Sequence, residues 1–293
     1  MESNKRKQIF GALLVVSGAA FWGTSGTAQA LGPEEAIPLT VASLRMIFGG
    51  FLLFLIVVTR RFIKLDRPSW PVKPLIVSVI GMTAFQPFFF TGVSLTGVAI
   101  GTIIIMGSAP VISGILSYIF LKEKLNSVWY VSTFFAIVGC VLLLISGEEK
   151  TAADPLGVIF SLIAGFAFSV YILGSKALLY HQPPEAVNAV VFVGGAVFLL
   201  PIAFLYPIDW IFEPSGYLMI FYLGAFSTVL GYLLFSSGLT RVPASTSVTL
   251  TLAEPLTAAL LGFFLLGEQI TSVNFLGIVF LFASLGLLSI KGN

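Results

Sequence analysis

A short apolar stretch near the N-terminus, "FWGTSG" (residues 21–26), contains the pattern G-x-S-G, which carries the nucleophile in one class of intramembrane serine proteases. A serine nucleophile needs a base within hydrogen-bond reach. The one histidine of the sequence, His181, begins the polar loop sequence "HQPPE" and cannot serve at membrane depth. We therefore expect Ser25 to lack a catalytic base, and we predict that the chain is not an enzyme. Gly23 and Gly26 are expected instead to let neighbouring helices approach closely.

The sequence also lacks the common patterns of metal, cofactor and nucleotide chemistry. It contains no H-E-x-x-H motif, no cluster of Cys and His ligands, no G-x-G-x-x-G and no Walker A motif. ATP is therefore not expected to drive the protein directly, and we predict no metal ion and no cofactor. The single cysteine, Cys140, rules out an intrachain disulfide and lies in an apolar run, where packing is its expected role.

Two charged residues, Arg45 and Glu254, fall near the middle of apolar segments. A charge at the centre of a bilayer costs about 2.5–3.5 kcal/mol on insertion scales, so such residues face the interior of the protein or water. One interpretation is a structural Arg45–Glu254 pair, or an arginine that caps backbone carbonyls. The other is a binding site, in which Arg45 holds a carboxylate and Glu254 binds an ammonium group or carries a transported proton.

Several polar and aromatic residues at a similar depth are candidates for the wall of the same site. Aromatic faces suit apolar or cationic solutes, although packing is an alternative role for each ring. Two prolines at matching places, Pro110 and Pro255, predict helix kinks that are either static or act as hinges. The predicted substrate-binding residues are Trp22, Ser25, Arg45, Gln86, Ser108, Tyr171, Tyr232 and Glu254.

The elements that position these residues follow from the composition. Hydrophobic residues make up 57% of the 293 residues and charged residues only 10%, whereas soluble domains carry about 25% charge. Such a chain cannot cover its surface with polar side chains, so its surroundings must be lipid. The basic residues lie beside the apolar segments, which fits contact with anionic lipid and not with nucleic acid.

A membrane-spanning helix needs about 20 apolar residues, and the sequence predicts ten such helices with short connections. Residues 74–121 hold no charge and are too long for one span, so the chain must turn back near "LTGVAIG" (95–101). The predicted spans are about 9–29, 37–59, 74–91, 99–121, 128–146, 156–178, 187–206, 216–239, 244–266 and 273–290.

The distribution of charge predicts the orientation of these spans. An even number of spans places both termini on one side, and the positive-inside rule assigns that side to the cytoplasm. The inner segments then hold 13 of the 15 Lys and Arg: Lys5, Arg6, Lys7, Arg60, Arg61, Lys64, Arg67, Lys73, Lys122, Lys124, Lys176, Arg241 and Lys291. The outer segments hold Lys150 and the acidic residues Glu34, Glu35, Glu148, Glu149, Asp154, Asp209, Glu213 and Glu268.

The chain resembles itself at an offset of 145 residues. The segment "ASTSVTLTLAEPLTAALLGFFLLGEQITSV" (244–273) aligns with "AIGTIIIMGSAPVISGILSYIFLKEKLNSV" (99–128) and preserves Pro110/Pro255 and Glu123/Glu268. The sequence therefore predicts two five-helix repeats, residues 1–147 and 148–293. Because five is odd, the second repeat begins on the opposite side and is inverted, a common plan of secondary transporters.

The sequence resembles the EamA family of the drug/metabolite transporter superfamily. The resemblance rests on "FWGTSG", "LRMIFGG", the "SAP" and "AEP" prolines and the endings "FLKEKL" and "FLLGEQI", and it covers essentially the whole chain in two copies. It implies ten-helix transporters of amino acids, amines and related metabolites, with a cavity between the two halves near the midplane.

We accordingly predict a secondary transporter in the bacterial cytoplasmic membrane that moves amino acids or amines by alternating access, as an exporter. Its expected partners are a small-molecule substrate, the lipid bilayer and a proton as coupling ion, and we expect it to act as a monomer. One alternative is a substrate of the phosphorylated or nucleotide-sugar type, which needs more cations than Arg45, with Lys176 as a helper. The other is a passive channel or lipid scramblase.

Overall fold

The computed structural model describes residues 2–60, 70–144, 154–267, 269 and 271–291. Some charges used to predict the orientation lie outside these residues: Arg61, Lys64, Arg67, Glu148, Glu149, Lys150 and Glu268.

The described residues form an all-α protein with ten helical segments long and apolar enough to cross a membrane, as predicted. Seven of them are single helices, and the other three segments are interrupted or end irregularly. The helices are α1 (Glu2–Ala30), α2 (Pro38–Arg60), α3 (Val72–Thr96), α4 (Val98–Leu116), η1 (Ser117–Leu121), α5 (Ser127–Leu144), α6 (Pro155–Leu179), α7 (Pro184–Ala203), η2 (Asp209–Phe212), α8 (Pro214–Tyr222), η3 (Leu223–Leu230), α9 (Gly231–Leu239), α10 (Ala244–Leu250), α11 (Ala253–Leu266) and α12 (Ser272–Lys291).

The predicted return of the chain within residues 95–101 takes place at one residue. Gly97 has φ 85°, a conformation that residues with a side chain rarely adopt, and it separates α3 from α4. The third span is longer than expected, because α3 continues to Thr96. The extra turn comes from apolar and small residues that carry no stop signal before the glycine.

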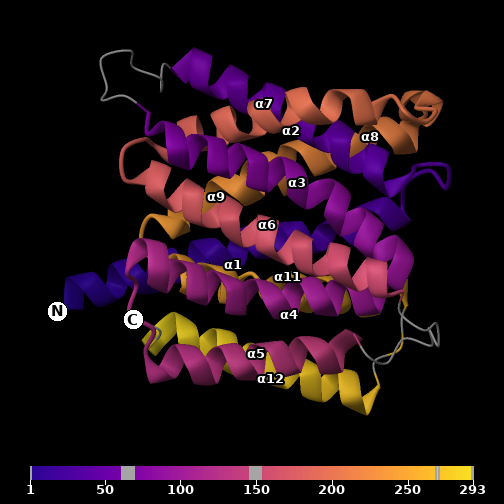
Figure 1. Ribbon diagram of the computed structural model, residues 1–293. Coiled ribbons are helices and arrows are strands. Elements are labelled where there is room, and N and C mark those ends of the chain that lie inside the picture. Colours follow the sequence, from indigo (N-terminus) through magenta and orange to yellow (C-terminus); the bar gives the residue numbers. More distant parts are fainter. Residues whose placement is uncertain (1, 61–69, 145–153, 268, 270, 292–293) are drawn as a thin grey trace.

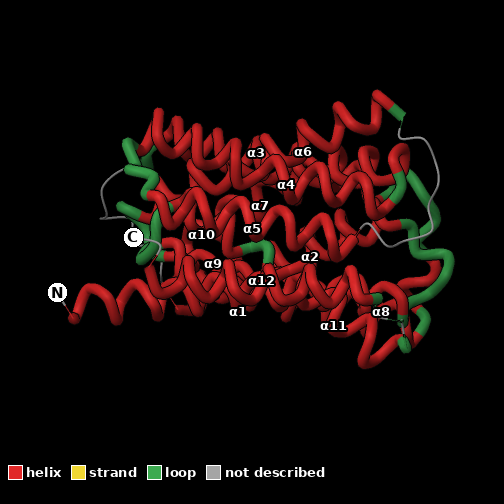
Figure 2. Tube along the Cα trace, turned by 90° about the horizontal axis from the view of Figure 1, so that it is seen from below, coloured by secondary structure: helices red, strands yellow, loops and turns green. Residues whose placement is uncertain are grey.

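The helices lie roughly parallel, with the connections gathered at two ends (Figure 2). The start of α1 and the end of α12 lie at the same end, which we call the terminal end (Figure 1). The other end, where α1 joins α2 and α3 joins α4, is called the distal end. The pair α5 and α12 forms one side of the bundle, and α2 packs against α7 on the other (Figure 1).

Contacts between the two halves follow a reciprocal pattern. Helix α6 packs along α3 and α4, and α1 packs in the same way along α9 and α11. The remaining large contacts join α2 to α7 and α5 to α12, so each joins corresponding helices of the two halves. Each half thus supplies an equivalent set of helices to the interface.

The two prolines predicted to kink matching helices have different effects on the backbone. Helix α4 continues through Pro110, whereas the matching span is divided into α10 and α11 just before Pro255. Proline has no N–H, so the Thr251 carbonyl receives the Glu254 N–H at 2.8 Å instead. This shorter bond takes the Glu254 amide away from the Leu250 carbonyl, and the helix is interrupted at 251–252.

The α5–α12 pair is held close by glycines that face each other. A Cβ added to Gly277 would lie 2.7 Å from the Gly139 carbonyl oxygen, and a Cβ added to Gly139 would lie 2.9 Å from the Gly277 carbonyl oxygen. Small residues that let backbones approach are a main source of helix association in membranes, where lipid removes the hydrophobic drive.

Replacing Gly277 by alanine is expected to lower stability by about 1–3 kcal/mol, because the new methyl group forces the two helices apart. Gly286→Ala is the matched control: it lies on the same helix and its added Cβ would meet no atom within 4 Å. The thermal unfolding midpoint of purified protein in detergent measures both. Equal midpoints for the two variants would contradict close packing at Gly277.

Candidate functional site

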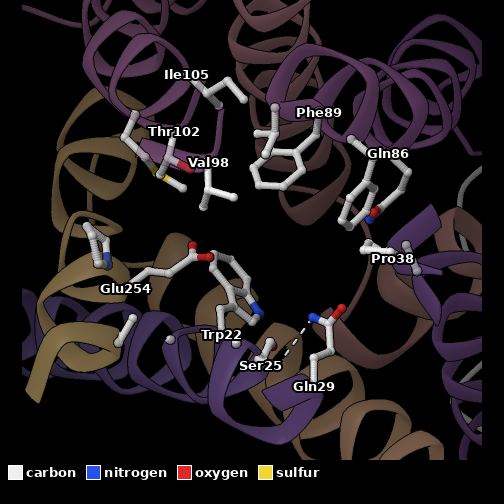
Figure 3. Close-up of a pocket in the computed structure, with 18 of the residues that line it drawn as sticks. Trp22, Ser25, Gln29, Pro38, Gln86, Phe89, Val98, Thr102, Ile105 and Glu254 are labelled. Atoms are coloured by element: carbon white, nitrogen blue, oxygen red, sulfur yellow. Dashed lines mark hydrogen bonds between the residues drawn. The ribbon is translucent and has the colours of Figure 1, made fainter. Parts of the chain in front are cut away.

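One cavity of about 1170 Å³ lies between the helices, and Figure 3 shows some of the residues that line it. Its lining residues at the ends of helices place its mouth at the distal end. Its rim includes Ala30 at the end of α1, Pro38 at the start of α2, Gly97 between α3 and α4, and Leu266 at the end of α11. Binding pockets for small molecules usually measure about 300–1,000 Å³. The cavity therefore has room for a small metabolite together with water.

Aromatic rings form the floor of the cavity about halfway through the bundle. The Trp22 ring lies 4.5 Å from the Tyr232 ring and 6.3 Å from the Phe168 ring, measured between centroids. Beneath this layer Phe235 is fully buried, with its ring 5.1 Å from that of Trp22. These rings separate the cavity from the terminal end.

Arg45 and Glu254 both line this cavity, as the sequence led us to expect for a binding site. Arg45 comes from α2 and Glu254 from the first turn of α11, whose N-terminal dipole favours a negative charge. In the described part of the chain neither side chain has a recorded hydrogen bond, and they form no ion pair with each other. The charges of Arg45 and Glu254 interact electrostatically with each other, and each also interacts with the Tyr232 hydroxyl.

Uncharged polar groups are arranged around the same space. The amide of Gln86, on α3, has no recorded hydrogen-bond partner among the described residues, although the residue is 2% exposed and lines the cavity. The Trp22 indole N–H is also buried without a partner. Ser25 is engaged: its hydroxyl lies 2.8 Å from the Ser227 hydroxyl and joins α1 to η3. Gln86 is thus available to a bound molecule, whereas the Trp22 N–H is enclosed beside Gly231 of α9 and Trp22 can contribute only its ring.

Two of the predicted site residues, Ser108 and Tyr171, are not among the residues that line the cavity. The Ser108 hydroxyl donates to the Ile105 carbonyl at 3.2 Å and packs against Gly165 of α6. Tyr171 lies one turn nearer the terminal end than Phe168 and is 1% exposed, inside the core. The distance of each residue from the ends of its predicted span indicated its position along the helix. It could not indicate the face of the helix on which the side chain lies.

Other residues that line the cavity were not predicted from the sequence. They are Gln29, Phe85, Phe89, Val98, Thr102, Phe168 and Thr251. Gln29 was recognisable as an amide near the end of an apolar helix, and Thr251 as a polar neighbour of Glu254. The aromatic and aliphatic ones carry no such signal, because the same residue types face lipid throughout the chain.

The two glycines of "FWGTSG" have different roles. Gly23 does allow a close approach: an added Cβ would lie 2.5 Å from the Glu254 carbonyl oxygen and 2.7 Å from the Thr257 Cβ. Gly26, expected to do the same, has no atom within 4 Å of an added Cβ and lines the cavity. The expectation for Gly26 was wrong, because three residues along α1 turn it from α11 to the open space.

Comparisons with known proteins identify relatives along the whole chain. The EamA-like transporter family matches residues 9–145 and again residues 155–290. An uncharacterized transporter of Bacillus subtilis, YwfM, is 43% identical over 280 residues, which cover 96% of this chain and 93% of that protein. The threonine/homoserine exporter RhtA of Escherichia coli K12 is 27% identical over 269 residues, 91% of this chain and 86% of that protein.

A solved crystal structure has the same fold. It superposes with a TM-score of 0.81 over 94% of this chain and 95% of that chain, at 18% sequence identity. Agreement over nearly the full length of both chains shows that the ten-helix architecture is shared.

The cavity is expected to be filled with water from the distal end. In a Cys140→Ser background, a cysteine at Gly26 should react rapidly with a charged maleimide, because the site is exposed and thiolate forms readily in water. A cysteine at Ala19, which is 0% exposed on the same helix, is the matched control and should stay unlabelled until denaturation. Similar labelling rates at the two positions would contradict the cavity as described.

Proposed function

The chain belongs to the EamA-like transporter family, and we propose that it exports amino acids or related amines from the cytoplasm. The protein is a multi-pass membrane transporter, with ten apolar spans in the described residues.

A single observation carries the substrate class: one cation and one acid line the same cavity, and neither is bound to another group in the described chain. An amino acid presents a carboxylate and an ammonium group on one small molecule. Arg45 can hold the carboxylate through two parallel N–H donors. Glu254 can accept hydrogen bonds from the ammonium group, and the ring faces of Trp22 and Tyr232 add cation–π attraction of about 0.5–2 kcal/mol.

The direction and the substrate class are also supported by a relative. RhtA is described as an exporter of threonine and homoserine, both of which are amino acids. An identity of 27% supports the class of substrate and not a particular amino-acid side chain, so we propose amino acids and amines as a class.

We propose alternating access between two inverted repeats, 1–147 and 148–293, as the mechanism. The reciprocal contacts of α6 and α1 support it, since exchanging the halves turns one packing arrangement into the other. The described cations Arg60, Lys73, Lys124 and Arg241 lie at the terminal end, which supports cytoplasmic termini in a bacterial inner membrane. The cavity then faces outward.

The alternatives receive less support from the cavity. A phosphorylated substrate needs several cations, whereas Arg45 is the one Lys or Arg in the described lining. Lys176, suggested above as a helper, is 6% exposed and its ammonium is bound to two backbone carbonyls near the terminal end. A passive channel needs a continuous path, and the aromatic floor interrupts it.

Glu254→Gln is expected to weaken amino-acid binding at least tenfold, because it removes a charge-assisted bond worth about 1.5–3 kcal/mol. If Glu254 also carries the coupling proton, flux by this variant in proteoliposomes becomes independent of an imposed pH gradient. Glu185→Gln is the matched control, an acid on α7 at the terminal end and outside the cavity lining. Wild-type affinity and pH dependence in Glu254→Gln would contradict both roles.

Arg45→Gln is expected to weaken binding of an amino acid about tenfold while leaving binding of the corresponding decarboxylated amine unchanged, since the arginine holds only the carboxylate. Thermal shift with threonine, homoserine, leucine and their amines measures both. If Arg45→Gln weakens binding of the amino acid and of the amine equally, Arg45 has a structural role and does not bind the carboxylate.

A further inference from the structure

The face of α4 that lines the cavity continues beyond it toward the terminal end. Thr102, Met106 and Ala109 line the cavity. Ser113 and Ser117 follow on the same face at helical spacing, in the part of the span that leads away from the distal end. Both serines are 0% exposed. The serine face of α4 therefore extends the cavity wall into the closed half of the bundle.

Helix α10 extends the opposite wall in the same direction. Thr251, which follows α10, lines the cavity. Ser247 lies one turn nearer the terminal end and is 0% exposed. Helix α10 packs against α4, whereas α4 has little contact with α11 among the described residues. Thr102 of α4 and Glu254 of α11 border the same open space instead (Figure 3).

The internal repeat relates the closed contact to the open cavity. At the offset of 145 residues, each of the buried serines has a counterpart that lines the cavity at the distal end. The matched pairs are Ser113/Ala258, Ser117/Gly262 and Ser247/Thr102. The same two spans are thus packed together at the terminal end and separated by the cavity at the distal end.

The two serines of α4 are buried without partners. Neither the Ser113 nor the Ser117 hydroxyl has a hydrogen-bond partner among the described residues. A serine inside a helix can donate to the carbonyl one turn back, as Ser78 of α3 does to Pro74 at 2.8 Å. A buried hydroxyl without a partner destabilises the packing around it, and water would satisfy it if the contact opened. The hydroxyls therefore favour a second conformation in which they are wet.

A small number of side chains hold this contact closed at its terminal end. The Glu123 carboxylate, from the segment that follows η1, accepts the Ala244 N–H at 2.7 Å and the Ser245 N–H at 3.1 Å. It also accepts the Ser245 hydroxyl at 2.8 Å. Glu123 thus ties the start of α10 to the end of the α4 span, and Lys176 binds carbonyls of the connection just before α10.

Deeper in the bundle, the two helices are bound to different neighbours. The Thr249 hydroxyl of α10 lies 3.0 Å from the Thr133 hydroxyl of α5. Helix α4 is bound to α6, since the Ser169 hydroxyl donates to the Ala109 carbonyl at 3.0 Å. Separation of α10 from α4 can therefore leave the packing of α4 on α6 intact.

We propose that the terminal half of the substrate path lies between α4 and α10, and that Ser113, Ser117 and Ser247 line it when α10 moves away from α4. The inference rests on the alternating access proposed above and not on the identity of the substrate. A hydroxyl both donates and accepts hydrogen bonds, so this passage suits a small zwitterion whose two charged ends pass the same wall.

The test measures access of water to the α4–α10 contact. In a Cys140→Ser background, a cysteine at Ser113 should react slowly with a small charged methanethiosulfonate reagent in purified protein, because the contact is mostly closed. Glu123→Gln keeps the size of the side chain but removes the charge that caps α10. It should raise the labelling rate of Ser113→Cys on the order of tenfold.

Three controls separate this path from a general loosening of the bundle. Ser78→Cys reports on a buried serine of the α3–α6 contact in the same half of the bundle, and it should stay unlabelled in both backgrounds. Glu185→Gln removes another acid at the terminal end and should leave the rates unchanged. Gly26→Trp places a bulky side chain in the distal cavity, where it hinders closure of the mouth, and should cancel the rise that Glu123→Gln causes.

If Glu123→Gln does not fold, Ser245→Ala removes one bond of the same closure and should raise the rate severalfold. Equal labelling of Ser113→Cys and Ser78→Cys in every background overturns the proposal. A rise that persists with Gly26→Trp also overturns it, because the opening is then independent of the distal mouth. The expected labelling without any amino-acid binding supports the path and rejects only the substrate class proposed above.

Discussion

The lack of water inside the hydrocarbon core is the constraint on which this structure depends. Every backbone N–H and C=O at that depth must find a partner within the protein, so regular helix is the rule. Irregular backbone is tolerated where protein or a cavity surrounds it. The interruption at 251–252 fits this condition, since Thr251 lines the cavity, and η3 reaches the site through the bond between Ser227 and Ser25.

The same constraint explains how charge is used. Charges that hold the fold are matched to backbone groups, as Lys176 is to carbonyls and Glu123 to N–H groups. Arg45 and Glu254 are not matched in this way within the described residues, although they lie nearer the middle of the bundle. Since an unmatched charge in lipid surroundings is costly, the position of both charges beside a cavity supports their proposed role in binding.

Much of the fold could be predicted from the sequence, because hydropathy and length decide the number of spans and because Gly97 marks the tight turn. Depth along a helix was equally readable, as Trp22 and Glu254 show. The face of the helix was not: Ser108 and Tyr171 have suitable depth but face neighbouring helices. The site also depends on the division of a span at Pro255, while Pro110, in the matching position, leaves α4 continuous. Sequence alone gives the same proline signal in both.

Gly26 has a consequence for how selectivity could change over time. Most glycines of the bundle sit where a methyl group would push helices apart, so they are fixed by packing. Gly26 instead borders the open cavity, and no atom lies within 4 Å of an added Cβ. Larger residues at this one position would narrow the cavity stepwise without disturbing any helix contact. Substitutions at residue 26 can therefore change the largest substrate that the cavity admits without changing the stability of the fold.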